Sequence, residues 1–526
     1  MKRGNAVRIR VFQIANFVFA ILFSFAIASV FIKSFQMSRL LLAIVFAVVL
    51  VGGFSLLQHA LQEKTRKQID HIFLGIAAVV FVAQLLCAYF LYAPPIHDLN
   101  YLNSAAKEFC LTGDRADLYQ DLPERHQHYF AVYPNNHALL IWLMMVYRIS
   151  YALTGTMSIA VPIFLNVIGL SISYHFLYRI AKMIFRNKVT PLFCAILGGL
   201  FSVFYTYTPY FYTDSSSMPL VMGAIYLFLK AMEQSTWKQW LPRLVACGVL
   251  VALGYKVKGS VVILVPAFLL YACCMGVRKN WKKATAFLSF VGIGAVICSG
   301  VLGAVPITDQ EELQAYQFPT IHWIMMGLEG NGGYHEEDFF YTKQSGDYEQ
   351  KKEADWIRLK ERVQKMGAAG MIQHVREKLA YTWGDGTYYI KTYLRNGTPN
   401  ALRNFVLHSR AFSDYCAIFH ETMLFFLFLA FFSGIRSDKI GAELLLKIIL
   451  CGVFSFFLLW EARSRYLVNF TPVFLLLEGY SIERIWLILP KKNKKLYKNT
   501  YLTKGEGDDI IIKLSQLSEG ERKEVE

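Results

Sequence analysis

The sequence predicts an all-α polytopic membrane protein with about 12 transmembrane helices. Of its 526 residues, 55% are hydrophobic and only 17% are charged. Apolar runs of roughly 18 residues or more recur along the chain, and each is long enough to cross a bilayer as a helix. Basic residues fall in short clusters between these runs, where the positive-inside rule places cytoplasmic loops. A soluble domain of this length would not combine these three features.

The apolar runs account for nearly half of the chain. Because the net charge of +16 is carried by the clusters between them, we expect orientation signals and no nucleic-acid partner. The first run follows a basic start and is too long for a signal-peptide core, so we expect it to be retained as a helix. The runs fall near residues 11–32, 40–57, 72–91, 157–181, 189–209, 218–232, 243–255, 259–277, 284–305, 415–434, 440–460 and 466–488.

The basic clusters predict the orientation of the chain. The clusters expected in the cytoplasm lie at residues 64–67, 182–188, 238–243, 278–283, 436–439 and 491–495. The loop after the third run, and with it Asp98, is then extracytoplasmic. An odd number of crossings must separate Asp98 from Lys182, yet two apolar stretches lie between them. We therefore expect residues 134–153 to form an interfacial or re-entrant helix at the outer surface, unless a cluster is misassigned and this stretch spans.

Two lysines interrupt the apolar run from residue 244 to residue 274. Basic clusters flank both ends of this run, so it should cross the membrane twice, with a turn at residues 254–259. Lys256 and Lys258 lie in that turn. A lysine within an apolar segment is costly unless it faces water or an anion. The turn therefore predicts an outward-opening cavity that holds a negatively charged group.

These elements divide the chain into five predicted regions. The polar segment at 306–413 is too long for a connector and has a helical pattern near residues 355–365, which indicates a substrate-facing subdomain. The regions are an N-terminal transmembrane hairpin at 1–71, a membrane core at 72–305 with an external loop at 94–133 and an interfacial helix at 134–153, an extracytoplasmic subdomain at 306–413, C-terminal transmembrane helices at 414–490, and a solvated cytoplasmic tail at 491–526.

Charged residues at the outer ends of the helices form the candidate site. A carboxylate can take a proton from an attacking hydroxyl, which makes Asp98 the candidate catalytic base. Lys and Arg can bind a phosphate, Arg in bidentate fashion. The structural alternatives are helix capping by Asp98 or Asp214, a snorkelling Lys256, and interfacial anchoring by the arginines. The residues expected to bind substrate are His97, Tyr101, Asp214, Lys256, Lys258, Glu461, Arg463, Arg465 and Tyr466.

The order of these motifs over residues 72–480 resembles the GT-C class of polytopic glycosyltransferases, close to the protein-mannosyltransferase and aminoarabinose-transferase type of glycosyltransferase family 39. Those enzymes usually show a paired Asp-Glu in this loop, whereas here Asp98 is preceded by His97 and followed by Leu99. The matching pieces are His97-Asp98-Leu99-Asn100-Tyr101 in the first external loop, Tyr133-Pro134-Asn135-Asn136-His137 at the start of an amphipathic helix, Tyr210 to Asp214 after a later helix, Lys258-Gly259 followed by Val265-Pro266, and Arg465-Tyr466 at the last helix.

The resemblance implies a GT-C-like bundle and an inverting transfer of a sugar from a polyprenyl-phosphate donor to a hydroxyl acceptor outside the cytoplasm. It also implies that Asp98 is the base and that Lys258 and Arg465 hold the lipid phosphate. The acceptor would be a cell-surface glycopolymer, a lipid or a protein, and we expect a bacterial cytoplasmic membrane.

The sequence alone does not decide whether a metal ion takes part or which of the candidate functions applies. No cofactor is expected, because no His/Cys/Asp cluster specifies a metal, although Asp98 and Asp214 could hold a divalent ion. The alternative functions are a transporter or flippase, or a polymerase, for lipid-linked saccharides. The apolar runs are nearly free of central charges, which favours an enzyme with its charges gathered at one face.

Overall fold

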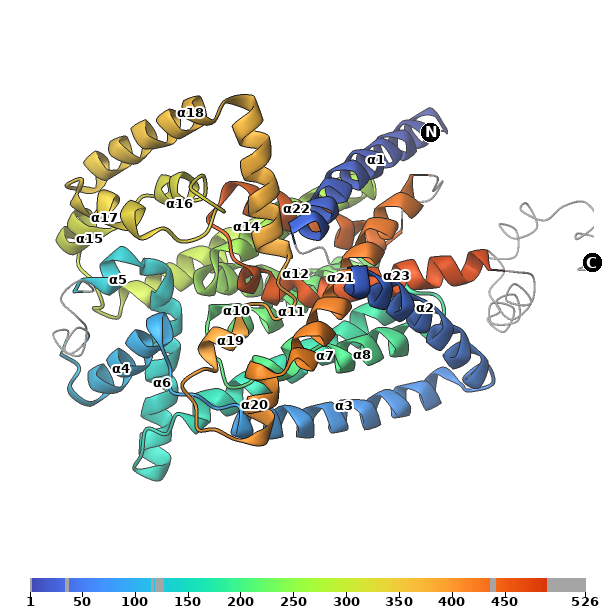
Figure 1. Cartoon of the computed structure of the whole chain (residues 1–526), viewed down its shortest axis with the longest axis horizontal. Coiled ribbons are helices and arrows are strands. Elements are labelled where there is room, and N and C mark those ends of the chain that lie inside the picture. The colour runs from blue at the N-terminus through green and yellow to red at the C-terminus, as the bar shows by residue number, and fades with distance from the viewer. Residues whose placement is uncertain (1, 34–36, 115–117, 119–126, 436–440, 490–526) are drawn as a thin grey trace, which may run out of the picture.

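A computed structural model describes residues 2–33, 37–114, 118, 127–435 and 441–489. Within these residues all regular structure is helical. Figure 1 shows long helices packed side by side, with α18 and several short helices gathered at one end of the bundle. The long helices of the bundle are α1 (Lys2–Lys33), α2 (Met37–Ala60), α3 (Arg66–Phe90), α7 (Ala160–Ile184), α11 (Met218–Glu233), α12 (Trp237–Val257), α14 (Val277–Gly303), α21 (Arg410–Gly434), α22 (Glu443–Leu459) and α23 (Thr471–Ile488).

Shorter elements fill the bundle and cover one end of it. Inside the bundle lie α8 (Thr190–Leu200), α9 (Val203–Thr206), α10 (Thr213–Ser216), η4 (Gly259–Ile263), α13 (Leu264–Cys274) and η5 (Ser464–Phe470). The elements near the end marked by α18 are α4 (His97–Thr112), α5 (Tyr129–Val132), η3 (Pro134–Asn136), α6 (His137–Thr154), α15 (Gln310–Tyr316), α16 (Thr320–Met326), α17 (Glu336–Gln344) and α18 (Tyr348–Trp383). Two further short helices, α19 (Ile390–Tyr393) and α20 (Ala401–His408), lie beside α10 and α3.

The predicted all-α polytopic fold is confirmed. Nine helices of the described residues are long and apolar enough to cross a membrane. The run predicted at 189–209 is not one helix, because it breaks after Leu200 into α8 and α9. The side-chain amide of Asn166 donates to the carbonyl oxygens of Tyr207 and Thr208, each at 2.9 Å. This buried amide satisfies carbonyls that a continuous helix would otherwise satisfy, so the break is tolerated inside the bundle.

Two of the predicted cytoplasmic clusters lie together at the end of the bundle opposite α4. The guanidinium of Arg66 donates to the carbonyl oxygen of Arg186 at 2.8 Å. The Lys188 ammonium donates to the carbonyl oxygens of Gln62 and Lys64, each at 2.7 Å. Since α3 has 25 residues and a helix rises about 1.5 Å per residue, Asp98 is separated from these clusters by one membrane thickness. The predicted tail at 491–526 lies outside the described residues.

The helix predicted near residues 355–365 is confirmed as part of α18, which is 36 residues long. Gly367 interrupts α18 with a left-handed φ of 57°, a conformation that glycine adopts at little cost, and the helix turns there (Figure 1). The second half of α18 packs against α1, where the rings of Phe23 and Trp383 meet edge to face at 5.7 Å. The boundaries of the five regions stay predictions.

Helix α6 corresponds to the helix predicted at the outer surface. Figure 1 shows it running steeply across the direction of α3 and α7, as expected of an interfacial helix. Its length and its mean hydropathy of 1.3, counted from Pro134 to Thr154, would also suit a span. It packs on α4, where Lys107 lies over the ring of Tyr147. The interfacial placement stays a prediction.

Candidate functional site

The break in the chain between α12 and η4 delivers a lysine to the site. Helix α12 ends at Val257, and Lys258 is extended, with φ −150° and ψ 116°, at the predicted turn. Its side chain is only 10% exposed and its ammonium forms an ion pair with the carboxylate of Asp214, which is 0% exposed. A buried charge needs a partner of opposite sign. Asp214 therefore fixes the position of the Lys258 ammonium.

Arg465, in η5, lies between two carboxylates. Its guanidinium is 4.0 Å from an Asp98 oxygen and 3.8 Å from an Asp214 oxygen. It also donates to the phenol oxygens of Tyr393 at 2.6 Å and Tyr210 at 3.2 Å. The guanidinium thus occupies the place between Asp98 and Asp214 where a shared divalent ion would lie. The described residues contain no group of three or more His, Cys, Asp or Glu side chains that could hold a metal. That the protein needs no cofactor stays a prediction.

Asp98 is partly exposed and is oriented by a buried tyrosine. Its side chain is 33% exposed, and the Tyr129 hydroxyl donates to it at 2.9 Å. The side-chain amide of Asn136 donates in turn to the Tyr129 oxygen at 2.7 Å. Burial, and then the charge of Asp98, raise the pKa of Tyr129 well above its ordinary value, so this phenol remains a proton donor. The capping alternative is wrong for Asp98, because the N-cap of α4 is Ile96 and makes no side-chain cap.

The residue before Asp98 has an unusual backbone. His97 has a φ of 51°, in the left-handed region that non-glycine residues adopt at a cost of about 1–3 kcal/mol. This conformation starts α4 one residue before the candidate base. The imidazole of His97 lies on the wall of the same cavity as Asp98. The left-handed turn therefore presents both side chains to one space.

One cavity of about 1500 Å³ brings the predicted residues together. All ten predicted site residues line it except Asp214. Asp214 lies behind Lys258 and Arg465 with its side chain fully buried. It does not cap α10, whose N-cap is Tyr212. From this position, the Asp214 carboxylate can hold the side chains of Lys258 and Arg465 toward the cavity.

Glu461, Arg463 and Tyr466 form a second charged group on the cavity wall. The Tyr466 hydroxyl donates to a Glu461 oxygen at 2.8 Å, and the Arg463 Nε lies 4.0 Å from the other oxygen. Burial raises the pKa of Glu461, while Arg463 and the bond from Tyr466 oppose the rise. Among the described residues, the Nε atoms of Arg463 and Arg465 are buried without a hydrogen-bond partner. Unfilled donors on buried cations are the groups that an anion would satisfy.

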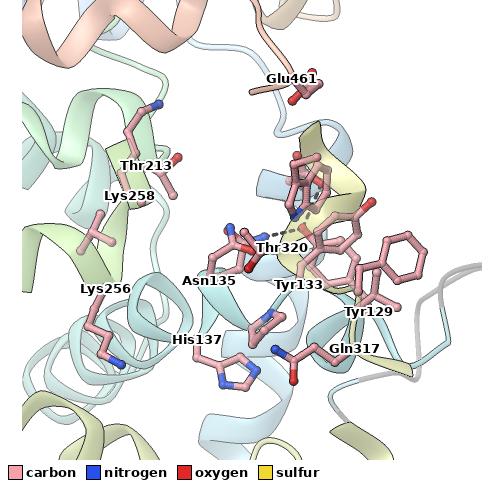
Figure 2. A pocket seen from close by; sticks show the side chains of 18 of the residues that line it. Tyr129, Tyr133, Asn135, His137, Thr213, Lys256, Lys258, Gln317, Thr320 and Glu461 are labelled. Carbon is pink, nitrogen blue, oxygen red and sulfur yellow. Dashed lines mark hydrogen bonds between the residues drawn. The ribbon is translucent and has the colours of Figure 1, made fainter. Parts of the chain in front are cut away.

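The cavity walls differ in character. Figure 2 places Lys256 and Lys258 on one side of the cavity and Tyr129, Tyr133 and Gln317 on the other. The two lysine side chains point in opposite directions, and Lys256 points toward His137 (Figure 2). The lining also includes apolar side chains from η4, which directly follows Lys258, and from the ends of α14 and α22. This apolar gallery consists of Val262, Leu302, Val305, Phe456 and Trp460.

Sequence reasoning missed the tyrosines that hold the charged groups. Tyr129 orients Asp98, while Tyr210 and Tyr393 bind Arg465. Tyr210 lies within a motif singled out in the sequence, and Tyr129 lies four residues before another. Tyr393 lies in a polar segment without any periodic pattern, so no local signal identifies it. Only the folding of distant segments onto one site reveals its role.

The solved structures similar to this chain are glycosyltransferases of the GT-C class that the sequence resembles. The oligosaccharyltransferase AglB from Archaeoglobus fulgidus, in complex with an inhibitory peptide and a dolichol-phosphate, has a TM-score of 0.40 and 13% identity over 83% of this chain and 53% of that chain. The apo oligosaccharyltransferase from Archaeoglobus fulgidus has a TM-score of 0.39 and 13% identity over 77% and 50% of the two chains. This chain thus spans about half the length of those enzymes.

A shorter solved structure is matched over more of its length. ArnT from Cupriavidus metallidurans, bound to undecaprenyl phosphate, has a TM-score of 0.34 and 12% identity over 80% of this chain and 78% of that chain. TM-scores this low carry no argument about activity, which must come from the site itself. No curated protein matches the sequence. A family model described as "Conserved hypothetical integral membrane protein" matches residues 5–486. The chain belongs to this family of integral membrane proteins.

Proposed function

We propose that this protein is a membrane glycosyltransferase that moves a sugar from a polyprenyl-phosphate donor to a hydroxyl acceptor on the extracytoplasmic side. One observation carries the proposal. A partly exposed carboxylate, Asp98, faces the same cavity as two cations, Lys258 and Arg465, which a second, buried carboxylate holds in place. A base on one side and phosphate-binding cations on the other are what transfer between a hydroxyl and a sugar phosphate requires.

The position of the cations supports a lipid-linked donor. The apolar gallery opens beside Lys258, so a polyprenyl chain in the gallery would bring its phosphate to the ammonium and to Arg465. Arg463 and Arg465 both line the cavity, where a guanidinium group can donate to phosphate oxygens. Arg465 is already held by Asp214 and two tyrosines, so the binding geometry would be organised before the donor arrives.

The reaction follows from this placement. The acceptor oxygen attacks the anomeric carbon of the donor sugar, and the bond from that carbon to the phosphate oxygen breaks. The acceptor proton passes to the Asp98 carboxylate, and the electron pair of the broken bond leaves on the phosphate. Lys258 and Arg465 stabilise the charge that develops there. Direct displacement of this kind inverts the anomeric configuration.

The experiment measures the transfer of a radiolabelled sugar from the lipid donor to the acceptor. Membrane vesicles containing the full chain are supplied with undecaprenyl phosphate linked to radiolabelled glucose, galactose, mannose or N-acetylglucosamine, and with cell-envelope material as acceptor. Asp98→Asn should lower transfer by about 10²–10⁴-fold, the usual contribution of a general base. Lys258→Ala should raise the donor concentration required for half-maximal transfer.

Asp70→Asn is the matched control, because Asp70 pairs with Lys182 at the opposite end of the bundle, 2.6 Å away. It should transfer as fast as the wild type. Equal transfer by Asp98→Asn would remove Asp98 as the base. Label that stays on the lipid but crosses the bilayer would identify the flippase alternative instead.

A further inference from the structure

The cavity is larger than a donor head group requires. Its volume of about 1500 Å³ exceeds the roughly 300–1,000 Å³ of sites for drug-sized ligands. The four lysines and arginines that line it all come from α12, the break after it, and the segment before and within η5. Lining residues 307–340, from the extracytoplasmic side, include no lysine or arginine among those described. They do include the carboxylates of Asp309 and Glu336, so a second molecule without negative charge has room opposite the cations.

A continuous strip of aromatic rings connects the base to this second part of the cavity. Tyr129, which donates to Asp98, meets Tyr133 with ring centroids 4.9 Å apart. Tyr133 meets Trp323 of α16 at 5.9 Å. On the other side of Tyr129, Tyr101 lies at 5.1 Å. The strip starts at Asp98 and ends on the subdomain. Tyr129 is buried, whereas Tyr133 and Trp323 are partly exposed, so a molecule packed against these two rings would extend toward the base.

Amide and hydroxyl groups lie on the cavity wall beside the strip. Asn135 is exposed and Gln317 is half-buried on the cavity wall, while Tyr334 is 41% exposed. With the rings of Tyr133 and Trp323, these three residues define what we call the acceptor subsite. Flat aromatic faces pack against the C–H face of a sugar ring, and amides both donate to and accept from its hydroxyls. The subsite combines both features.

We propose that the acceptor subsite binds a saccharide, so that the hydroxyl glycosylated belongs to a carbohydrate chain. This inference rests on the proposed function, because an acceptor has meaning only if Asp98 is the base. A lipid acceptor would need an apolar lining, and the cavity has this on the side of the cations, in the apolar gallery.

The test measures saccharide binding separately from turnover. Saturation-transfer NMR is recorded on the full chain in a detergent without a sugar head group, with maltotriose, cellotriose and mannotriose as probes. We expect at least one trisaccharide to bind the wild type. Trp323→Ala and Tyr334→Ala should each weaken that binding by about tenfold, equivalent to about 1.4 kcal/mol. Trp323→Phe should retain most of it, because the ring is preserved.

A donor-side measurement keeps the two proposals apart. Lys258→Ala should lose binding of undecaprenyl phosphate and keep that of the trisaccharide. If undecaprenyl phosphate binding does not depend on Lys258, the proposed donor site is wrong whatever the trisaccharides do. If no trisaccharide binds, or if Trp323→Ala and the more exposed Tyr334→Ala both bind as the wild type does, the saccharide inference is wrong. Binding of a Ser/Thr-containing heptapeptide that depends on Trp323 would replace it with a protein acceptor.

Discussion

Replacing Asp214 by asparagine tests whether this carboxylate holds the phosphate-binding cations in place. The substitution keeps the size of the side chain and an acceptor oxygen but removes the charge. The Lys258 ammonium then loses its buried counter-ion, and Arg465 keeps only Asp98 at 4.0 Å and two tyrosine hydroxyls. Because Asp214 does not line the cavity, the effect on substrate should arise entirely through the two cations.

The loss of stability expected for Asp214→Asn follows from the burial of the Asp214–Lys258 ion pair. Asp214 is 0% exposed and the Lys258 side chain 10% exposed, and removing one partner of a buried pair costs about 3–5 kcal/mol. Removing both charges leaves no uncompensated ion, and such replacements are often neutral. The double variant Asp214→Asn with Lys258→Met should therefore recover most of the lost stability, giving a coupling energy of about 3 kcal/mol or more. The donor site should be lost in both variants.

The assay is thermal unfolding of the purified protein in detergent, followed by tryptophan fluorescence, together with undecaprenyl phosphate binding. Asp70→Asn provides the matched control, because Asp70 and Lys182 form an ion pair whose side chains are 37% and 30% exposed. An exposed pair contributes only about 0–1 kcal/mol, so this variant should melt close to the wild type. A double variant no more stable than Asp214→Asn alone would refute the reasoning, as would Asp214→Asn melting no lower than Asp70→Asn.

Three further outcomes are expected. Tyr129→Phe removes the 2.9 Å hydrogen bond to Asp98. Because a hydrogen bond to a charged group contributes about 1.5–3 kcal/mol, kcat should fall by about 10–100-fold. An unchanged kcat at saturating donor would contradict this. Burial lowers the pKa of Lys378 from 10.5 to about 7, so the unfolded chain binds more protons between these values and stability should rise with pH across that range. The melting temperature of Lys378→Met should lack this rise. Gly332→Ala should destabilise the protein more than Gly367→Ala in the same melting assay. Both glycines have φ above 50°, but only at Gly332 would a Cβ lie 2.6 Å from the Lys378 side chain. Equal shifts in melting temperature would rule out the steric explanation.

The positions of the helices could be predicted because apolar runs and basic clusters report on the bilayer directly. The break at Lys258 was visible for the same reason, since two lysines cannot lie within a span at no cost. The different roles of Asp98 and Asp214 could not be predicted. Both are acids at the outer end of a helix, and only the folded structure shows that Asp98 is 33% exposed and Asp214 fully buried, with Arg465 between them.

One sequence argument is wrong in a specific place. The apolar runs were expected to be nearly free of central charges, yet Glu478 lies in the middle of α23 with its side chain fully buried. Neither carboxylate oxygen has a hydrogen-bond partner among the described residues. Hydropathy averaged over a window hides a single acid among strongly apolar neighbours. The preference for an enzyme over a transporter therefore depends on the site around Asp98 rather than on the spans.

The edge-to-face contact between Phe23 and Trp383 has a consequence for biosynthesis. The two rings are separated by most of the polypeptide, and at about 5–20 residues per second the ribosome needs roughly 20–70 s to supply the second after the first. During that time α1 lies in the bilayer with its future contact surface facing lipid. The second half of α18 cannot pack against α1 until the chain has been synthesised past Trp383. A chain that stops earlier would be inserted in the membrane without the subdomain over its cavity.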